Sequence, residues 1–398
     1  MADWIADPDS YVNGPPHSRF DDARRLEPVQ WVDGGDEPGF WAILRYPDAL
    51  RVAEATNYFS PIDNGIAIDD MAPLYLGDLR QLLLATDDDT PTAAPVDLDA
   101  WALDDVMNGL EDRVRAATRA VLDQARESGS HLDFVHQVAL PAAVNTLTDL
   151  LGVPADDRSH LYGVALRNSG NDEVDPAERA PRGAARLELA AYAANFSADR
   201  RTARPQGDLT DVLLAGATDL GALDDIDFAG VFVQLVMMST DTIAGLMSSG
   251  MMALFEHPGS YLDLRGNRGE IPVAVEEMLR WANPVNVMSR VALVDTRMGG
   301  KEMKAGDRVG IVCTAANRDA DIFELPHAFD IARDPNPHLS LGVGDIQFDL
   351  GATLTRLQGR VFFEEVFKRW RHLEQAGLAL WQRSSLNNSL RQLPIEAR

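Results

Sequence analysis

One stretch, from Phe228 to His257, limits the folds open to this chain more than any other. It contains VFVQLVMMSTDTIAGLMSSGMMALFEH and is apolar nearly all round, which predicts a long helix buried through the middle of the fold. A polar interruption, Ser239 to Thr242, falls in mid-helix. A carboxylate and hydroxyls are costly there unless they are hydrogen-bonded or face a cavity. The central helix is therefore also the first place to look for a site.

The composition bounds the class of protein. The chain has 398 residues, of which 45% are hydrophobic, so it can bury a sizeable core. Its formal net charge of −26 argues against nucleic acid and anionic membranes as partners, because both require Lys and Arg on the contact face. No uninterrupted apolar run reaches the roughly 20 residues that span a bilayer, and the N-terminus lacks a basic-then-apolar signal pattern. We therefore expect a cytoplasmic protein without a membrane span.

The remaining patterns predict a mainly α protein with a small β-rich part. The apolar runs Val29 to Val32 and Phe40 to Leu44, joined by a glycine-rich connection, indicate a hairpin. Residues 134–225 have apolar positions at helical spacing. We expect one domain over residues 1–398, with β-rich parts at roughly 28–60 and 285–325. The single cysteine, Cys313, lies in a short apolar run typical of a strand, which favours a buried structural thiol over a reactive one.

Residues 338–356 read HLSLGVGDIQFDLGATLTR, a glycine-framed loop followed by a helical pattern. This run resembles the haem-binding loop of the cytochrome P450 superfamily, with the spacing intact. The resemblance places Leu341 where that family has a phenylalanine, Gln347 where it has a basic residue and Asp349 where it has the cysteine that holds the iron. It implies a P450-like fold whose haem site has lost its metal ligand.

Other segments resemble the same family over nearly the whole chain. In the central helix the family's acid and alcohol are retained as Asp241 and Thr242, whereas its small pair is replaced by Met238 and Ser239. The family's Glu-x-x-Arg is matched by Glu277 and Arg280, for which the resemblance implies a structural role.

Three further comparisons bear on the site. Arg290 matches an arginine that meets a haem propionate in the family. The segment Pro326 to Phe329 lacks the arginine that completes the family's buried triad with the Glu-x-x-Arg pair, which puts in doubt the rigid segment, called the meander, that the family has here. Pro91 and Pro95 stand in place of a basic pair that contacts the propionates.

From these losses we expect a haem-free protein without a cofactor, and Gln347, Asp349 and Arg290 are then vestiges of a haem site. A carboxylate is a harder and weaker donor than a thiolate and would not replace it. Cys313 lies too far before the loop to take over its role.

The first functional hypothesis is a haem-independent protein that binds an apolar small molecule such as a sterol, terpenoid or polyketide. Met237, Met238, Ser239 and Met288 would contact the ligand, although a methionine stripe is more often plain core. Asp241, Thr242 and Asp349 would carry acid–base chemistry, because buried carboxyl groups have raised pKa values. The alternative for Asp349 is a cap on the following helix, and for Asp241 a satisfied acid in a helix kink.

The second hypothesis is a non-catalytic partner of a biosynthetic enzyme such as a glycosyltransferase, since family members that lack the cysteine resemble such auxiliaries. A third is a haem protein whose iron has a ligand other than a thiolate.

Overall fold

The computed structural model describes residues 3–33, 39–60, 104–169, 182–215, 223–342 and 347–398. The chain divides into two compact units. The first, which we call the sheet unit, comprises residues 1–76, 249–348 and 380–390. The second, the helical unit, comprises residues 77–248, 349–379 and 391–398. The single domain expected over residues 1–398 stays a prediction, and residues Pro91 and Pro95 lie outside the described part.

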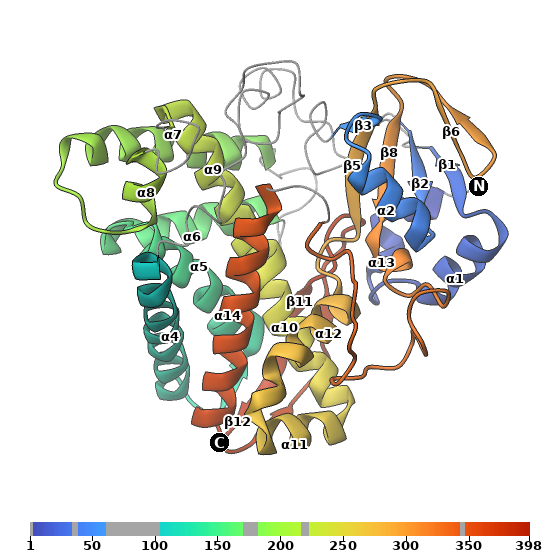
Figure 1. Cartoon of the computed structure of the whole chain (residues 1–398). Coiled ribbons are helices and arrows are strands. Elements are labelled where there is room, and N and C mark those ends of the chain that lie inside the picture. The colour runs from blue at the N-terminus through green and yellow to red at the C-terminus, as the bar shows by residue number, and fades with distance from the viewer. Residues whose placement is uncertain (1–2, 34–38, 61–103, 170–181, 216–222, 343–346) are drawn as a thin grey trace. The chain divides into compact units, whose positions relative to one another are not determined.

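The sheet unit is built on a five-stranded sheet (Figure 1). Its strand order is β1-β2-β8-β5-β3, and β2 and β8 are parallel while the other pairs are antiparallel. The bounds are β1 Val29–Val32, β2 Phe40–Ile43, β3 Phe59–Ser60, β5 Val287–Ala292 and β8 Arg308–Val312. The predicted hairpin is confirmed, since Val29 pairs with Ile43 and Val32 with Phe40. A second hairpin joins β6 Thr296–Met298 to β7 Lys301–Met303.

Helices cover this sheet because each presents an apolar face. In α2, for example, Tyr46, Ala49, Val52 and Ala53 are buried, at the spacing of one helix face. The helices of the unit are α1 His17–Leu26, α2 Tyr46–Glu54, α11 Pro258–Gly266, α12 Ile271–Ala282 and α13 Cys313–Ala316, with short turns η1 Asp3–Ile5, η2 Pro8–Tyr11 and η5 Arg268–Glu270. Cys313 begins α13 directly after β8, so its predicted place in a strand is wrong, although the thiol is fully buried.

The helical unit packs long helices around one apolar core that contains the aromatic side chains of α7 and α9. Its elements are α4 Asp104–Glu127, η3 Val135–Ala139, α5 Leu140–Leu150, α6 Ala155–Ser169, α7 Arg182–Thr202, α8 Leu209–Ala215 and α14 Gln347–Arg369. Three short strands complete it, β4 His131–Asp133, β12 Pro394–Ala397 and β9 Leu373–Gln375, with β12 between the other two. Strands β10 Leu380–Trp381 and β11 Leu390–Gln392 form a further pair. The sequence patterns did not predict these C-terminal strands.

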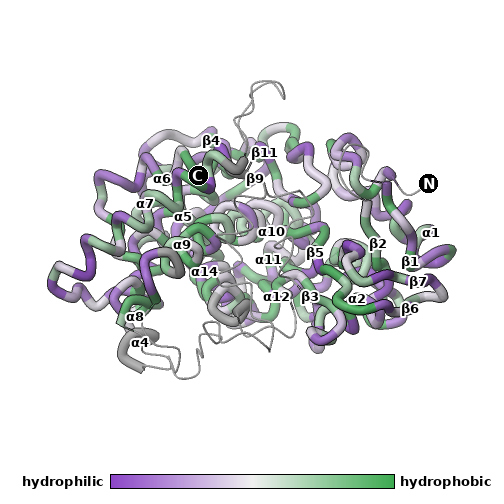
Figure 2. The backbone as a smooth tube through the Cα atoms, turned by 90° about the horizontal axis from the view of Figure 1, so that it is seen from above, coloured by the Kyte–Doolittle hydropathy of each residue, from purple (hydrophilic) through white to green (hydrophobic). Residues whose placement is uncertain are grey.

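The predicted central helix is confirmed and interrupted where its sequence turns polar. It consists of α9 Asp225–Met238, a π-helical turn η4 over Ser239–Ile243, and α10 Ala244–Glu256. The stretch Phe228–Glu256 is long and apolar enough to cross a membrane, but 78% of its most apolar window is buried inside the protein. It is therefore a buried core helix of this protein. In Figure 2 hydrophobic residues colour much of α9 and α12, while hydrophilic residues gather in connecting loops. The mainly α fold with small sheets is confirmed.

Candidate functional site

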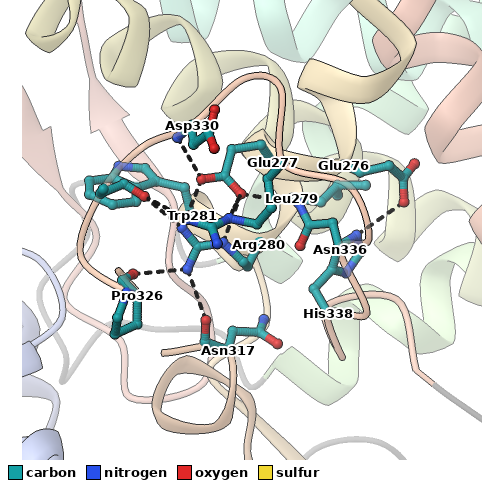
Figure 3. A network of polar contacts seen from close by, with 12 residues as sticks. Glu276, Glu277, Leu279, Arg280, Trp281, Asn317, Pro326, Asp330, Asn336 and His338 are labelled. Carbon is teal, nitrogen blue, oxygen red and sulfur yellow. Dashed lines mark hydrogen bonds and ion pairs between the residues drawn. The ribbon is translucent and has the colours of Figure 1, made fainter. Parts of the chain in front are cut away.

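Glu277 and Arg280 form a fully buried ion pair on α12 (Figure 3). The Arg280 Nε and Nη2 atoms donate to the two Glu277 carboxylate oxygens at 2.7 and 2.8 Å. The three-residue spacing places both side chains on the same helix face. Arg280 also donates to the backbone carbonyls of Asn317, Pro326 and Ala328, so one guanidinium satisfies carbonyls from two loops. Their predicted structural role is consistent with this geometry.

The same carboxylate organises residues 320–338, which contain no helix or strand. Its Oε2 accepts from Arg333 Nε at 3.1 Å and from Asn336 Nδ2 at 3.0 Å, and its Oε1 accepts from the Asp330 backbone N–H at 2.9 Å. Arg333 thus supplies a second guanidinium, although the Pro326 to Phe329 segment has Ala328 where the family has arginine. The segment that follows Pro326 therefore still supplies a second guanidinium to Glu277. It comes from Arg333, five residues after Ala328. The sequence contains this arginine in the run ARDPNPH, but it lies outside the Pro-x-Arg-Phe spacing on which the prediction was based.

A chain of buried amides and hydroxyls continues from this network toward the glycine-framed loop. Asn317 Nδ2 donates to Asn283 Oδ1 at 2.9 Å and to Ser340 Oγ at 2.8 Å, and Asn317 Oδ1 accepts from the Leu339 N–H at 2.8 Å. Ser340 Oγ in turn donates to the Leu279 carbonyl at 2.7 Å. The start of the loop is therefore fixed to α12 up to Ser340, because buried networks of this kind are costly to break.

The π-helical turn holds three of the predicted site residues within four consecutive positions. Ser239 is fully buried, Thr242 is 8% exposed and Asp241 is half-buried. Thr240 Oγ1 donates back to the Met237 carbonyl at 3.0 Å, whereas Ser239 Oγ has no hydrogen-bond partner in the described part of the chain. A π turn displaces the side chains that follow it, and such turns are frequent at functional sites.

Met237 and Met238 pack against the core of the helical unit. A Cβ atom added at Gly351, on α14, would lie 2.6 Å from Met238 Sδ, so the methionine fills the space that this glycine leaves. Both methionines therefore have a packing role, and their contact with a ligand stays a prediction.

The only cysteine of the sequence lies in the core of the sheet unit beside Met288, the fourth predicted ligand contact. Burial raises the pKa of the Cys313 thiol to about 12, although the charge of Arg290 acts to lower it. The thiol is therefore neutral at pH 7. Arg290 is itself buried and donates to the Ser289 carbonyl at 2.8 Å.

Gln347 and Asp349 belong to the first turn of α14, which begins before the expected start near Gly351. Their side chains lie outside the described part of the structure. The structure thus brings together Glu277 with Arg280, and Asp241 with Thr242, Ser239 and the two methionines, on single helices.

Comparison with known proteins identifies the family. The Cytochrome P450 family model matches residues 271–335, which include the Glu277 network. A putative cytochrome P450 126 of Mycobacterium tuberculosis is 31% identical over 99% of this chain and 97% of its own length. The steroid C26-monooxygenase of Rhodococcus jostii is 29% identical over 98% of this chain and 84% of its own. A solved structure, Mycobacterium marinum CYP268A2 in complex with pseudoionone, is 28% identical with a TM-score of 0.84 over 99% of this chain and 96% of that one. The chain belongs to the cytochrome P450 superfamily.

The expectation of a haem-free protein without a cofactor is wrong. Relatives that match almost the whole chain are named as P450 proteins and as monooxygenases, and proteins of this family bind haem. The same names contradict the hypothesis of a non-catalytic auxiliary of a glycosyltransferase. The error came from judging the cofactor by substitutions at a few haem-site positions, whereas the similarity extends over almost the whole chain.

The chemical state of Cys313 can be compared with what a haem iron requires of a sulfur ligand. A thiolate, not a thiol, ligates iron, and a thiolate requires a lowered pKa and an accessible sulfur. Cys313 has the opposite properties, because it is fully buried among apolar side chains and its pKa is raised to about 12. In this buried, neutral state the Cys313 thiol does not fit the role of an iron ligand.

Proposed function

We propose that this protein binds haem together with an apolar small molecule of the steroid or isoprenoid class, and oxidises that molecule. The observation that carries the proposal is the match, over 98% of the chain, to a protein named steroid C26-monooxygenase. The similarity to a solved P450 in complex with pseudoionone supports an apolar ligand. When bound, haem supplies the redox chemistry. A cytoplasmic location and the contact of Met288 with the ligand remain predictions.

The chain's own contribution would come from the π-helical turn. A half-buried carboxyl and a neighbouring hydroxyl, Asp241 and Thr242, can hold a proton and pass it to a bound molecule. Ser239 Oγ, buried and without a partner in the described residues, is available to a polar atom of that molecule. Asp241→Asn keeps the shape of the side chain and removes the titrating proton. We expect it to lower turnover roughly 100-fold with unchanged ligand affinity, and equal turnover would refute this role.

An absorbance spectrum tests the proposal itself. The protein, expressed with a haem precursor and purified, should show a Soret band with about one iron per chain. Titration with a steroid should shift that band, since the ligand would change the surroundings of the iron. A purified, folded protein without a Soret band or bound iron would overturn the proposal.

We also propose that a group other than the Cys313 thiol holds the iron, because that thiol is buried and neutral. Cys313→Ser and Cys313→Ala should then leave the haem content and the spectrum of the reduced carbon monoxide complex unchanged. A thiolate-type spectrum in the natural protein that disappears in both variants, while the proteins remain folded, would show instead that Cys313 is the ligand.

A further inference from the structure

Arg318 is a buried cation whose hydrogen-bonding capacity is mostly unused. It follows α13 and is 2% exposed, and its guanidinium stacks over the Trp281 ring at 4.7 Å. Its Nη2 atom donates to the Trp281 carbonyl at 3.1 Å. Its Nε and Nη1 atoms have no partner within the described ranges of the chain. Buried donors are nearly always satisfied, so these two atoms call for an explanation.

The nearby carboxylates already have other hydrogen-bond or ion-pair partners. Asp21 pairs with Arg24 at 2.6 Å and with His327 at 2.8 Å, and Glu277 pairs with Arg280 at 2.7 Å. Asp319, which follows Arg318, accepts from the Tyr46 backbone N–H at 2.9 Å. Burial, followed by the charge of Arg280, lowers the pKa of Arg318 to about 9, which still leaves it protonated at pH 7. No carboxylate of the described residues forms a direct ion pair with Arg318, although the charges of Glu277 and Asp21 act on it. A buried charge without a direct partner is expensive in a protein interior.

A second unsatisfied group lies on α1, which packs against α13, since Arg24 Nη1 of α1 donates to the Ala315 carbonyl of α13 at 2.7 Å. The His17 ring, at the start of α1, has a buried Nδ1 atom without a partner in the part of the chain that the structure describes. Burial, followed by the charge of Arg318, lowers the pKa of His17 to about 2, so the imidazole is neutral. In the tautomer protonated at Nδ1 it can donate one hydrogen bond without adding charge.

We propose that a small monovalent inorganic anion, of which chloride is the test case, binds at Arg318 and His17. Arg318 offers two N–H groups and a positive charge that the anion would compensate, and His17 offers a third N–H. A water molecule could accept these hydrogen bonds but would leave the charge uncompensated. Because Arg318 is buried and His17 is partly buried, a small ion suits the site better than an organic acid. The inference does not depend on the proposed function, since neither Arg318 nor His17 lies in the π-helical turn or is proposed as an iron ligand.

Thermal unfolding of the purified protein tests this proposal. In chloride the Tm should rise with concentration and then level off, by about 2 °C over sodium gluconate of the same ionic strength, because an ion that binds only the folded state stabilises it. In crystals grown with bromide, an anomalous peak should lie within hydrogen-bond distance of Arg318. Equal Tm values in chloride and gluconate, with no bromide peak, would overturn the proposal in favour of a buried water.

A pair of variants assigns the effect to the site. Arg318→Met keeps the length of the side chain and its packing on Trp281 but removes the charge, so its Tm should no longer depend on chloride. Arg25→Met removes an exposed cation, with 73% of its side chain accessible, and should keep the dependence of the natural protein. If Arg318→Met fails to fold, the anion titration and the bromide crystals of the natural protein still decide the question.

Discussion

Among the described residues, Glu277 in the sheet unit and Glu365 in the helical unit are fully buried carboxylates bound by guanidinium groups, and their surroundings differ. In the sheet unit, Glu277 receives Arg280 from its own helix and Arg333 from a segment without helix or strand. In the helical unit, Glu365 on α14 receives Arg115 at 2.9 Å and Arg119 at 3.0 Å, both from α4. Glu365 therefore joins two helices, each of which has its own backbone hydrogen bonds.

The difference lies in what each carboxylate holds in place. Helices α4 and α14 keep their shape without Glu365, and Arg115 keeps a second partner in Glu364 at 2.7 Å. Residues 320–338 lack the regular backbone hydrogen bonds of a helix or strand. Their conformation therefore depends on the hydrogen bonds that Glu277 accepts from them. A buried ion pair therefore contributes more to the conformation of a segment without helix or strand than to the conformation of two helices that it connects.

The largest effect is expected from Glu277→Gln. The amide keeps the shape but leaves Arg280 and Arg333 without a buried counter-charge, and loss of one partner from a buried pair costs about 3–5 kcal/mol. Urea unfolding measures this change. The control is Glu276→Gln, the adjacent residue, whose side chain is 27% exposed and which pairs with His338. If both variants lose the same stability, Glu277 is no more important than a partly exposed neighbour.

A smaller and pH-dependent effect is expected from Glu365→Gln. Hydrogen bonds and charges from Arg119 and Arg115 outweigh burial and hold the pKa of Glu365 at about 2, below its ordinary value of 4.5. The folded state therefore binds the proton less readily than the unfolded state, so the stabilisation is complete above about pH 4.5 and is lost as the pH falls toward 2. At pH 7 the variant should be less stable by about 2 kcal/mol.

Urea unfolding from pH 7 down to pH 3 measures the difference in unfolding free energy between the natural protein and Glu365→Gln. This difference should become smaller as the pH falls. The exposed Glu374→Gln, with 51% of its side chain accessible, is the control and should parallel the natural protein. A gap for Glu365→Gln that is constant with pH would contradict the electrostatic account.

The smallest effect is expected from Ala328→Arg, which restores the arginine that the family has at this position. Because Arg280 and Arg333 already occupy the Glu277 oxygens, the change in unfolding free energy should stay below about 1 kcal/mol. Arg333→Met should destabilise the protein, and Ala328→Arg should then recover part of that loss. Without recovery in this double variant, the two positions are not equivalent sources of charge.

The sequence predicted the fold well because its signals were local and periodic. The apolar stretch from Phe228 to His257 became the central helix, and the polar residues from Ser239 became its π-helical turn. Residues 380–397 were missed because their strands are two to four residues long, too short to show an alternating pattern.

The site was predicted less well, for two reasons. The second guanidinium on Glu277, that of Arg333, comes from a different position in an irregular segment, which a fixed motif spacing does not anticipate. The cofactor was judged from Asp349, Gln347 and the prolines in place of a basic pair, whereas the chain is similar to a named monooxygenase over 98% of its length. The unsatisfied donors of Arg318 and His17 depend on packing between distant segments, for which a single sequence has no signal.

The burial of Cys313 makes the protein its own probe of unfolding. A thiol that is enclosed and protonated reacts with alkylating reagents only when the surrounding segment opens. Since the sequence has no second cysteine, the rate of labelling in native buffer reports the opening of a single location in the sheet unit, without any engineered label.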